Sequence, residues 1–221
     1  MLHDLLRREG FSLGRRHVAT LMRRMGLQAI YRQPRTRDKH PSHQVCPYLL
    51  RNLKIERANQ VWSMDTTYIA MAKGFVYLTA VIDVASRALL GWRVATTLES
   101  CHAVDALEQA FESYGVPDIV NTDQGSQFTA ESFVNAVRDR GCRISMDGRG
   151  AWRDNIFIER FWRTIKYDEV YLHAYDSVAI ARQRIDRFIA WYNHARPHTS
   201  VDKATPIEAY HAQLPALAQA A

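Results

Sequence analysis

Residues 61–95 read VWSMDTTYIAMAKGFVYLTAVIDVASRALLGWRVA and decide the fold. Three runs in and around this stretch, 61–70, 75–84 and 87–96, are rich in β-branched and aromatic residues and are separated by short turns. The middle run is apolar on both faces, which is typical of an interior strand. The pattern therefore predicts three successive strands of one sheet.

The following residues alternate between helical and strand patterns. Helices are expected at 102–114, 131–140, 154–168 and 178–194, and strands at 118–121 and 142–146. Three successive strands followed by alternating helices and strands indicate an α/β fold, in which helices pack on a mixed sheet.

The composition is that of a globular protein with unevenly distributed charge. Of 221 residues, 47% are apolar and 24% charged, which excludes a wholly disordered chain. No membrane span or signal peptide is expected, and three well-separated cysteines suit a reducing cytoplasm. Residues 1–60 carry 13 basic and 4 acidic side chains, whereas the remainder has a net charge of −3. This asymmetry predicts a nucleic-acid partner, with a solvated basic tail as the alternative.

Three segments are expected along the chain. Residues 1–30 form two short helices around a Gly-containing turn, which is either part of a helix-turn-helix or a bare helical hairpin. Residues 31–57 are basic, contain three prolines and are predicted to be a linker. Residues 58–221 form the main domain and include a C-terminal helix.

Three carboxylates are candidates for chemistry. Asp65 lies within the first strand, where a buried carboxylate is costly without a partner. Asp123 ends the run DIVNTD, and open α/β sheets place ligands outside strand carboxyl ends. Together with Glu159 on a facing helix, they could hold two Mg²⁺ ions, because hard cations prefer oxygen ligands. Each also has a structural alternative, since Asp65 can bond a nearby backbone group and Asp123 can cap a turn.

The helix that carries Glu159 has one apolar face and one polar face. At ~100° per residue, Glu159 shares a narrow stripe with Asn155, Arg163 and Lys166. Residues 138–166 hold eight basic and four acidic side chains. Beside a metal centre, this excess predicts a track for phosphates.

The carboxylate spacing resembles the D,D(35)E pattern of retroviral integrases and insertion-sequence transposases. Asp65 and Asp123 are separated by 57 residues, Asp123 and Glu159 by 35, and Lys166 lies seven residues beyond Glu159. The surrounding phrases match as well: NQVWSMDTTYI, GFVYLTAVIDVASR, NTDQGSQFT, ISMDGRGAWRDNIFIERFWRTIKYDEVYL and WYNHARPHTS. Residues 48–212 resemble the integrase-core protein encoded by the second open reading frame of such bacterial elements.

This resemblance implies a ribonuclease H-like fold with a mixed five-stranded sheet. It implies metal-dependent cleavage at a transposon end, followed by attack of the freed 3′-hydroxyl on target DNA. Asp65, Asp123 and Glu159 fall on the catalytic triad and would ligate two Mg²⁺ or Mn²⁺ ions. The positions implied to contact DNA are Lys166, Arg163 and Asn155.

The resemblance also implies partners and a location. The expected substrates are double-stranded element ends and target DNA, bound by a homo-oligomer in the bacterial cytoplasm, at the nucleoid. Residues 1–47 resemble the helix-turn-helix-like segment of the family but begin late. An upstream-frame helix-turn-helix protein, separate or fused, is therefore implied for end recognition.

Two alternative functions remain open, and the sequence departs from the family pattern at two positions. The chain could be a non-catalytic DNA-binding remnant without its end-recognition partner, or a nuclease of the same fold acting on RNA–DNA hybrids. Ala58 stands where a proline is common, and Thr199 where a glutamine is common.

Two further aspartates are not expected to be metal ligands. Asp83 is expected to fix a strand end or bond Arg87, and Asp147 is expected in solvent.

The tryptophans and the start of the catalytic helix complete the predictions. Trp62, Trp92 and Trp162 are expected in the core, whereas Trp152 is a candidate for stacking on a base. Asp154 is expected at the start of the helix, where the macrodipole favours a carboxylate.

Overall fold

The computed structural model describes residues 2–26, 44–147 and 155–215. Trp152 and Asp154 lie outside these ranges. None of the helices within them is long and apolar enough to cross a membrane.

Contacts divide the chain into two compact units, residues 1–39 and 40–221. The first unit contains two helices, as predicted: α1 (Leu2–Arg8) and α2 (Arg15–Arg24). Val18 is the buried residue of this pair, so its packing is slight. The segment boundaries at residues 30 and 57 remain predictions.

The second unit contains a sheet and its covering helices. The strands are β1 (Val61–Ala70), β2 (Phe75–Asp83), β3 (Leu89–Ala95), β4 (Ile119–Thr122) and β5 (Arg143–Met146). The helices are α3 (Ser100–Tyr114), α4 (Ser126–Thr129), α5 (Glu131–Asp139), α6 (Ile156–Asp168), η1 (Val170–Leu172), α7 (Val178–His194), η2 (Thr199–Val201) and α8 (Pro206–Ala212).

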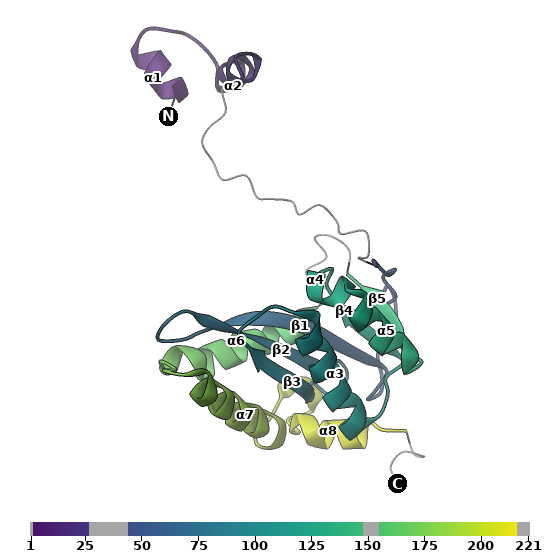
Figure 1. Cartoon of the computed structure of the whole chain (residues 1–221). Coiled ribbons are helices and arrows are strands. Elements are labelled where there is room, and N and C mark those ends of the chain that lie inside the picture. The colour runs from purple at the N-terminus through teal and green to yellow at the C-terminus, as the bar shows by residue number, and fades with distance from the viewer. Residues whose placement is uncertain (1, 27–43, 148–154, 216–221) are drawn as a thin grey trace. The chain divides into compact units, whose positions relative to one another are not determined.

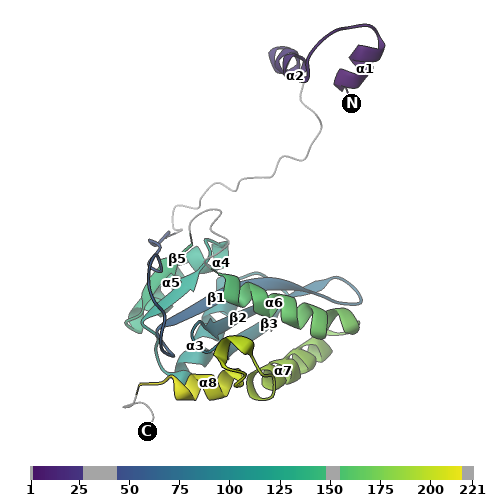
Figure 2. The ribbon, with the colours of Figure 1, turned by 180° about the vertical axis from the view of Figure 1, so that it is seen from behind.

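The five strands form one mixed sheet in the order β3-β2-β1-β4-β5 (Figure 1). The first three strands pair antiparallel, whereas β4 and β5 pair in parallel with β1 and with each other. Helix α3 lies over one face of the sheet, and α6 lies over the other (Figure 2). The predicted mixed sheet is confirmed.

Alternation along β1 decides which face carries chemistry. Trp62 and Met64 are fully buried on the α3 side, within the core that α3, α5 and α8 cover. Because successive strand residues point to opposite faces, Ser63, Asp65 and Thr67 face α6. Asp65 therefore lies on the face that the Glu159 helix covers.

Gly91 allows α3 to approach the edge strand β3 closely. A Cβ atom at this position would lie 2.1 Å from the carbonyl oxygen of Ala106, which is far inside contact distance. The helix can therefore lie against the strand only because residue 91 has no side chain.

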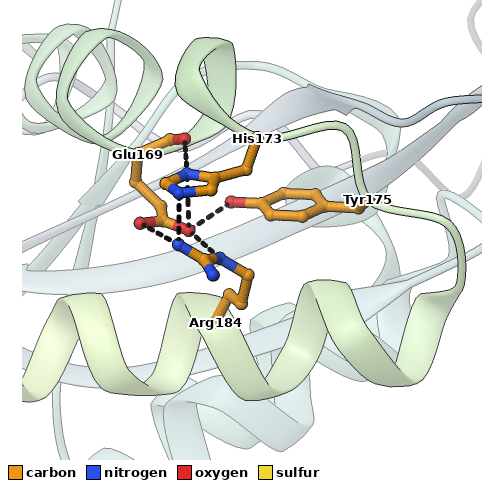
Figure 3. Close-up of polar contacts among 4 residues, drawn as sticks. All are labelled: Glu169, His173, Tyr175 and Arg184. Carbon is orange, nitrogen blue, oxygen red and sulfur yellow. Dashed lines mark hydrogen bonds and ion pairs between the residues drawn. The ribbon is translucent and has the colours of Figure 1, made fainter.

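A polar cluster joins the end of α6 to α7 (Figure 3). The Arg184 guanidinium donates to both Glu169 oxygens at 2.6 and 3.3 Å, and the Tyr175 hydroxyl donates to Oε1 at 3.1 Å. Arg184 also lies 2.7 Å from Nε2 of His173. Because arginine only donates, Nε2 accepts, so His173 carries its proton on Nδ1 and donates to the Glu169 carbonyl at 2.8 Å.

Two features differ from the sequence-based expectations. The described part of the predicted linker, residues 44–57, packs on the main unit, where Cys46 is buried and the Leu49 amide donates to Ser145 Oγ at 3.0 Å. The bounds of α8, the last helix of the chain's described part, were not predicted, although Thr205 and Glu208 form a capping box that can be recognised in the sequence TPIE.

Candidate active site

Asp65 is held in the middle of β1 by two hydrogen bonds. The indole Nε1–H of Trp162 on α6 donates to Oδ2 at 2.8 Å. The backbone N–H of Thr66 donates to Oδ1 at 2.7 Å. These bonds fix the carboxylate orientation while each oxygen keeps a further lone pair for a ligand.

The pKa of Asp65 depends on its burial and on the charges of the other two carboxylates. Burial raises the pKa of Asp65 to about 6. The two hydrogen bonds oppose this rise, whereas the charges of Asp123 and Glu159 add to it. Asp65 therefore lies within electrostatic reach of both other carboxylates.

Asp123 follows β4 at its carboxyl end, as the sequence predicts. Its Oδ1 accepts the backbone N–H of Gly125 at 2.9 Å, so it also caps the turn before α4. The side chain remains exposed, yet partial removal from water raises its pKa. Asp123 therefore caps the turn, as its structural alternative predicts, and its carboxylate also remains exposed.

Glu159 lies in the first turn of α6 and is exposed. Arg163, one turn further, is also exposed, and its guanidinium lies 6.0 Å from the ring centroid of Tyr167. The opposite side of the helix buries Ile158 and Ile165 in the core, as its periodicity predicts.

Asn155 has a different environment from Arg163. It is buried at the start of α6, where its Oδ1 accepts a bond from the Ser63 hydroxyl. Its amide nitrogen donates to the Met64 carbonyl at 3.4 Å. The side chain therefore ties α6 to β1, and DNA contact by Asn155 stays a prediction.

A row of small polar residues supports the carboxylates from within the sheet. Ser63, Asn121 and Ser145 are register neighbours on β1, β4 and β5. Each lies two residues before an aspartate, so the three aspartates that follow face the same side. Asn121 Oδ1 is buried and has no hydrogen-bond partner among the described residues.

The third of these aspartates corrects the sequence analysis. Asp147 was expected in solvent, but it is buried and accepts a bond from the Asn121 amide at 3.0 Å. Its carbonyl accepts the Gln124 amide at 2.9 Å. The expectation was wrong because Asp147 follows β5 directly and keeps the inward direction of that strand.

Lys166 lies beside Asp65 on the same face of the sheet. Its Nζ donates to Thr67 Oγ1 at 2.7 Å. Partial burial lowers the pKa of Lys166, and the charge of Asp65 opposes this change. The Lys166 ammonium therefore lies close to Asp65, where it could interact with a bound phosphate group.

Replacement of Lys166 tests this position. We expect Lys166→Ala to flatten the slope of log affinity for duplex DNA against log salt by about one. Metal binding should persist, because no carboxylate is removed. Fluorescence anisotropy over a salt series measures the slope, with exposed Lys73→Ala as the control. An unchanged slope and unchanged activity would make Lys166 an ordinary solvated side chain.

Asp83 and the tryptophans lie largely as expected. Asp83 is fully buried and fixes the end of β2, where its carboxylate accepts the amide and hydroxyl of Ser86 at 2.8 Å each. Trp62 and Trp162 are buried in the core, and Trp92 is half-buried at its edge. The bond from Trp162 to Asp65 was missed, because it joins residues that are 97 positions apart.

The donor set fits a divalent cation in its chemistry. The three carboxylates offer the oxygen ligands that hard cations prefer, and a bound positive charge would offset the repulsion that Asp65 experiences from Asp123 and Glu159. In the ranges 2–26, 44–147 and 155–215, no three His, Cys, Asp or Glu side chains are assembled as a metal site.

Comparison with known proteins decides the family. Integrase core domain models match residues 55–151 and 140–206, and an HTH-like domain model matches residues 1–35. The transposase for insertion sequence element IS904 of Lactococcus lactis is 32% identical over 91% of this chain and 82% of its own length. The chain belongs to the insertion-sequence transposases. A second relative, the transposase for insertion sequence element IS629 of Shigella sonnei, is 30% identical over 92% of this transposase and 70% of its own length.

Solved structures share the fold of this transposase. A simian T-cell lymphotropic virus intasome chain covers 80% of it with a TM-score of 0.65 at 19% identity, and 62% of that chain is matched. The HTLV-2 integrase catalytic core domain in complex with magnesium covers 69% of it, with a TM-score of 0.57 at 20% identity and 97% of that chain matched. The ribonuclease H-like fold and the α/β class are thereby confirmed.

The family and the fold establish the activity class. The transposase is an enzyme of DNA transposition and integration, a polynucleotidyl transferase with an integrase-type core. The HTH-like domain indicates DNA binding.

Proposed function

We propose that Asp65, Asp123 and Glu159 are the catalytic residues of this transposase and together ligate two Mg²⁺ or Mn²⁺ ions. The observation that carries the proposal is a direct contact: Trp162, on the helix that carries Glu159, donates to the Asp65 carboxylate at 2.8 Å. Asp123 follows β4, which pairs in parallel with the strand of Asp65. All three carboxylates are present, which favours catalysis over a non-catalytic remnant. Bound divalent cations supply stabilisation of the attacking and leaving oxygens in phosphoryl displacement.

The chain's own residues orient this chemistry. Trp162 and Thr66 hold the Asp65 carboxylate in place, and Asn155 fixes the start of the helix that carries Glu159. In the first step, water attacks a phosphodiester at the element end and the 3′-oxygen leaves. In the second step, the freed 3′-hydroxyl attacks a target phosphodiester, and the target 3′-oxygen leaves. Lys166 and Arg163 contact the phosphates beside the scissile position.

A strand-transfer assay tests this function. The chain is incubated with duplexes bearing the terminal sequences of its source element, a supercoiled target, and Mg²⁺ or Mn²⁺. We expect joined products that a chelator abolishes. If an upstream-frame helix-turn-helix protein is the partner for end recognition, adding or fusing it should raise the yield. The proposal also places this reaction in the cytoplasm, at the nucleoid.

The isolated chain should bind duplex DNA with little preference for element ends. Residues 1–60 carry a net charge of +9, which can neutralise phosphates of any sequence. The helix pair α1 and α2 buries little more than Val18, so it is a weakly organised reader of bases. Titration at fixed salt compares end sequences with scrambled duplexes. A preference of about a thousandfold, the lower range for specific binders, would make residues 1–30 a true sequence reader.

A further inference from the structure

A pocket rich in arginine side chains lies along one flank of α6. It has a volume of about 300 Å³ and is formed by α6, the end of α7 and the segment that contains η2. Four arginines line it: Arg87, Arg160, Arg163 and Arg196. The hydroxyl groups of Thr199 and Ser200 add further donors, whereas the Thr164 hydroxyl donates to the Arg160 carbonyl at 3.1 Å.

The positive charge of this pocket is poorly compensated. In the described part of the chain, its lining includes no Asp or Glu. Arg196 lies 3.6 Å from Asp168, which is outside the lining.

Arg87 stacks on Phe157 at 3.7 Å. Burial and, to a smaller extent, the charge of Arg160 lower the pKa of Arg87. The lining residue Tyr192 and Asp83, which is outside the lining, oppose this change. Crowded guanidiniums of this kind attract an anion.

Backbone strain accompanies the placement of Arg87. This residue has a φ of 71°, in the left-handed region, which residues other than Gly, Asn and Asp rarely adopt. The strained turn presents the guanidinium to the pocket.

His198 supplies a second observation that points to a ligand of this pocket. Its Nε2 is buried and has no hydrogen-bond partner among the described residues. Burial and the charges of Arg196 and Arg87 lower the pKa of His198 to about 4, so the ring is neutral at pH 7. A neutral imidazole with its proton on Nε2 can donate to an anionic oxygen.

The position of the pocket relative to the carboxylates suggests which anion it binds. At ~100° per residue, Arg160 and Arg163 lie on one side of Glu159, whereas Trp162 and Lys166 lie on the other. We propose that this arginine pocket binds a backbone phosphate of the DNA duplex whose scissile phosphate lies at the carboxylates. The inference rests on the proposed function, and it adds a phosphate site built from α7 and η2 as well as α6.

The test measures DNA binding without metal, so it is independent of catalysis. Two variants perturb the pocket from different elements: Arg160→Gln on α6 and Ser200→Asp in η2. Two matched controls change exposed residues elsewhere, Arg187→Gln on α7 and Ser113→Asp on α3. Anisotropy of a labelled duplex is recorded in EDTA between about 50 and 200 mM salt, the range over which phosphate contacts are strongly screened.

Both pocket variants should reduce the salt slope by about one phosphate contact. Their loss of affinity relative to wild type should then be about 3.5-fold larger at the low-salt end than at the high-salt end. The controls should keep the wild-type slope. Thermal melting confirms that each variant is folded, and if Ser200→Asp does not fold, exposed Arg160→Gln decides the test.

Equal slopes for pocket and control variants would overturn the proposal. This result would leave strand transfer by the wild-type chain untouched. Conversely, absent strand transfer with altered slopes would reject the proposed catalytic role and keep the phosphate site.

Discussion

Asp65→Asn, Asp123→Asn and Glu159→Gln should each abolish cleavage and joining while the protein stays folded. An amide cannot replace an anionic metal ligand, and the lost transition-state stabilisation amounts to several kcal/mol. A loss of about 4 kcal/mol corresponds to roughly 10³-fold in rate. The strand-transfer assay with Mg²⁺ or Mn²⁺ measures this loss.

The matched control for the triad is an aspartate remote from the three carboxylates. Asp176→Asn removes one exposed carboxylate just before α7 and should keep wild-type activity. Circular dichroism separates loss of catalysis from loss of fold. Full activity in any one of the triad variants would remove that residue from the active site.

Glu169→Ala should lower the melting temperature by about 6–12 °C. The substitution leaves the buried Tyr175 hydroxyl and the Arg184 guanidinium without their shared acceptor (Figure 3). Breaking a buried ion pair costs about 3–5 kcal/mol, and the partial exposure of Arg184 places the expected loss near the lower bound. For a unit of this size, each kcal/mol shifts the melting temperature by about 2–4 °C.

Two further variants define the origin of that loss. Glu169→Gln keeps an acceptor for Tyr175 and should be less destabilised than the alanine variant. Glu112→Ala removes an exposed glutamate on α3 and should melt like wild type. If Glu169→Ala melted within about 2 °C of wild type, the cluster would not stabilise the junction of α6 and α7.

Local pattern was sufficient to predict most of the fold. Alternation in β1 and the doubly apolar β2 run gave the strands, and helical periodicity gave α3, α5, α6 and α7. These patterns are reliable because burial on one or both faces dictates residue type along an element. The capping box of α8 can also be recognised in the sequence, because it depends on residues only three positions apart, although the bounds of α8 were not predicted.

The candidate site was only partly predictable. Spacing and resemblance located the three carboxylates, but not the contacts that orient them. The bonds from Trp162 to Asp65 and between Asn155 and Ser63 span more than 90 positions, so they depend on how α6 lies on the sheet. Burial of Asp147 was missed for a similar reason, because it depends on Asn121 of the neighbouring strand.

The arginine pocket could not be predicted from the sequence for the same reason. Its residues come from the turn before β3, from α6 and from the segment after α7, and no single motif contains them. The sequence indicated a basic stretch at residues 138–166. Only the folded chain adds Arg87, Arg196 and His198 to the arginines of α6.

The central claim is that Asp65, Asp123 and Glu159 jointly hold the divalent cations at which DNA strands are transferred. The most direct test is anomalous diffraction from crystals of the transposase bound to an end duplex in Mn²⁺. The account predicts two Mn²⁺ peaks about 3.5–4 Å apart, ligated by oxygens of all three carboxylates. Mn²⁺ bound elsewhere, or bound without one of these three side chains, would contradict it.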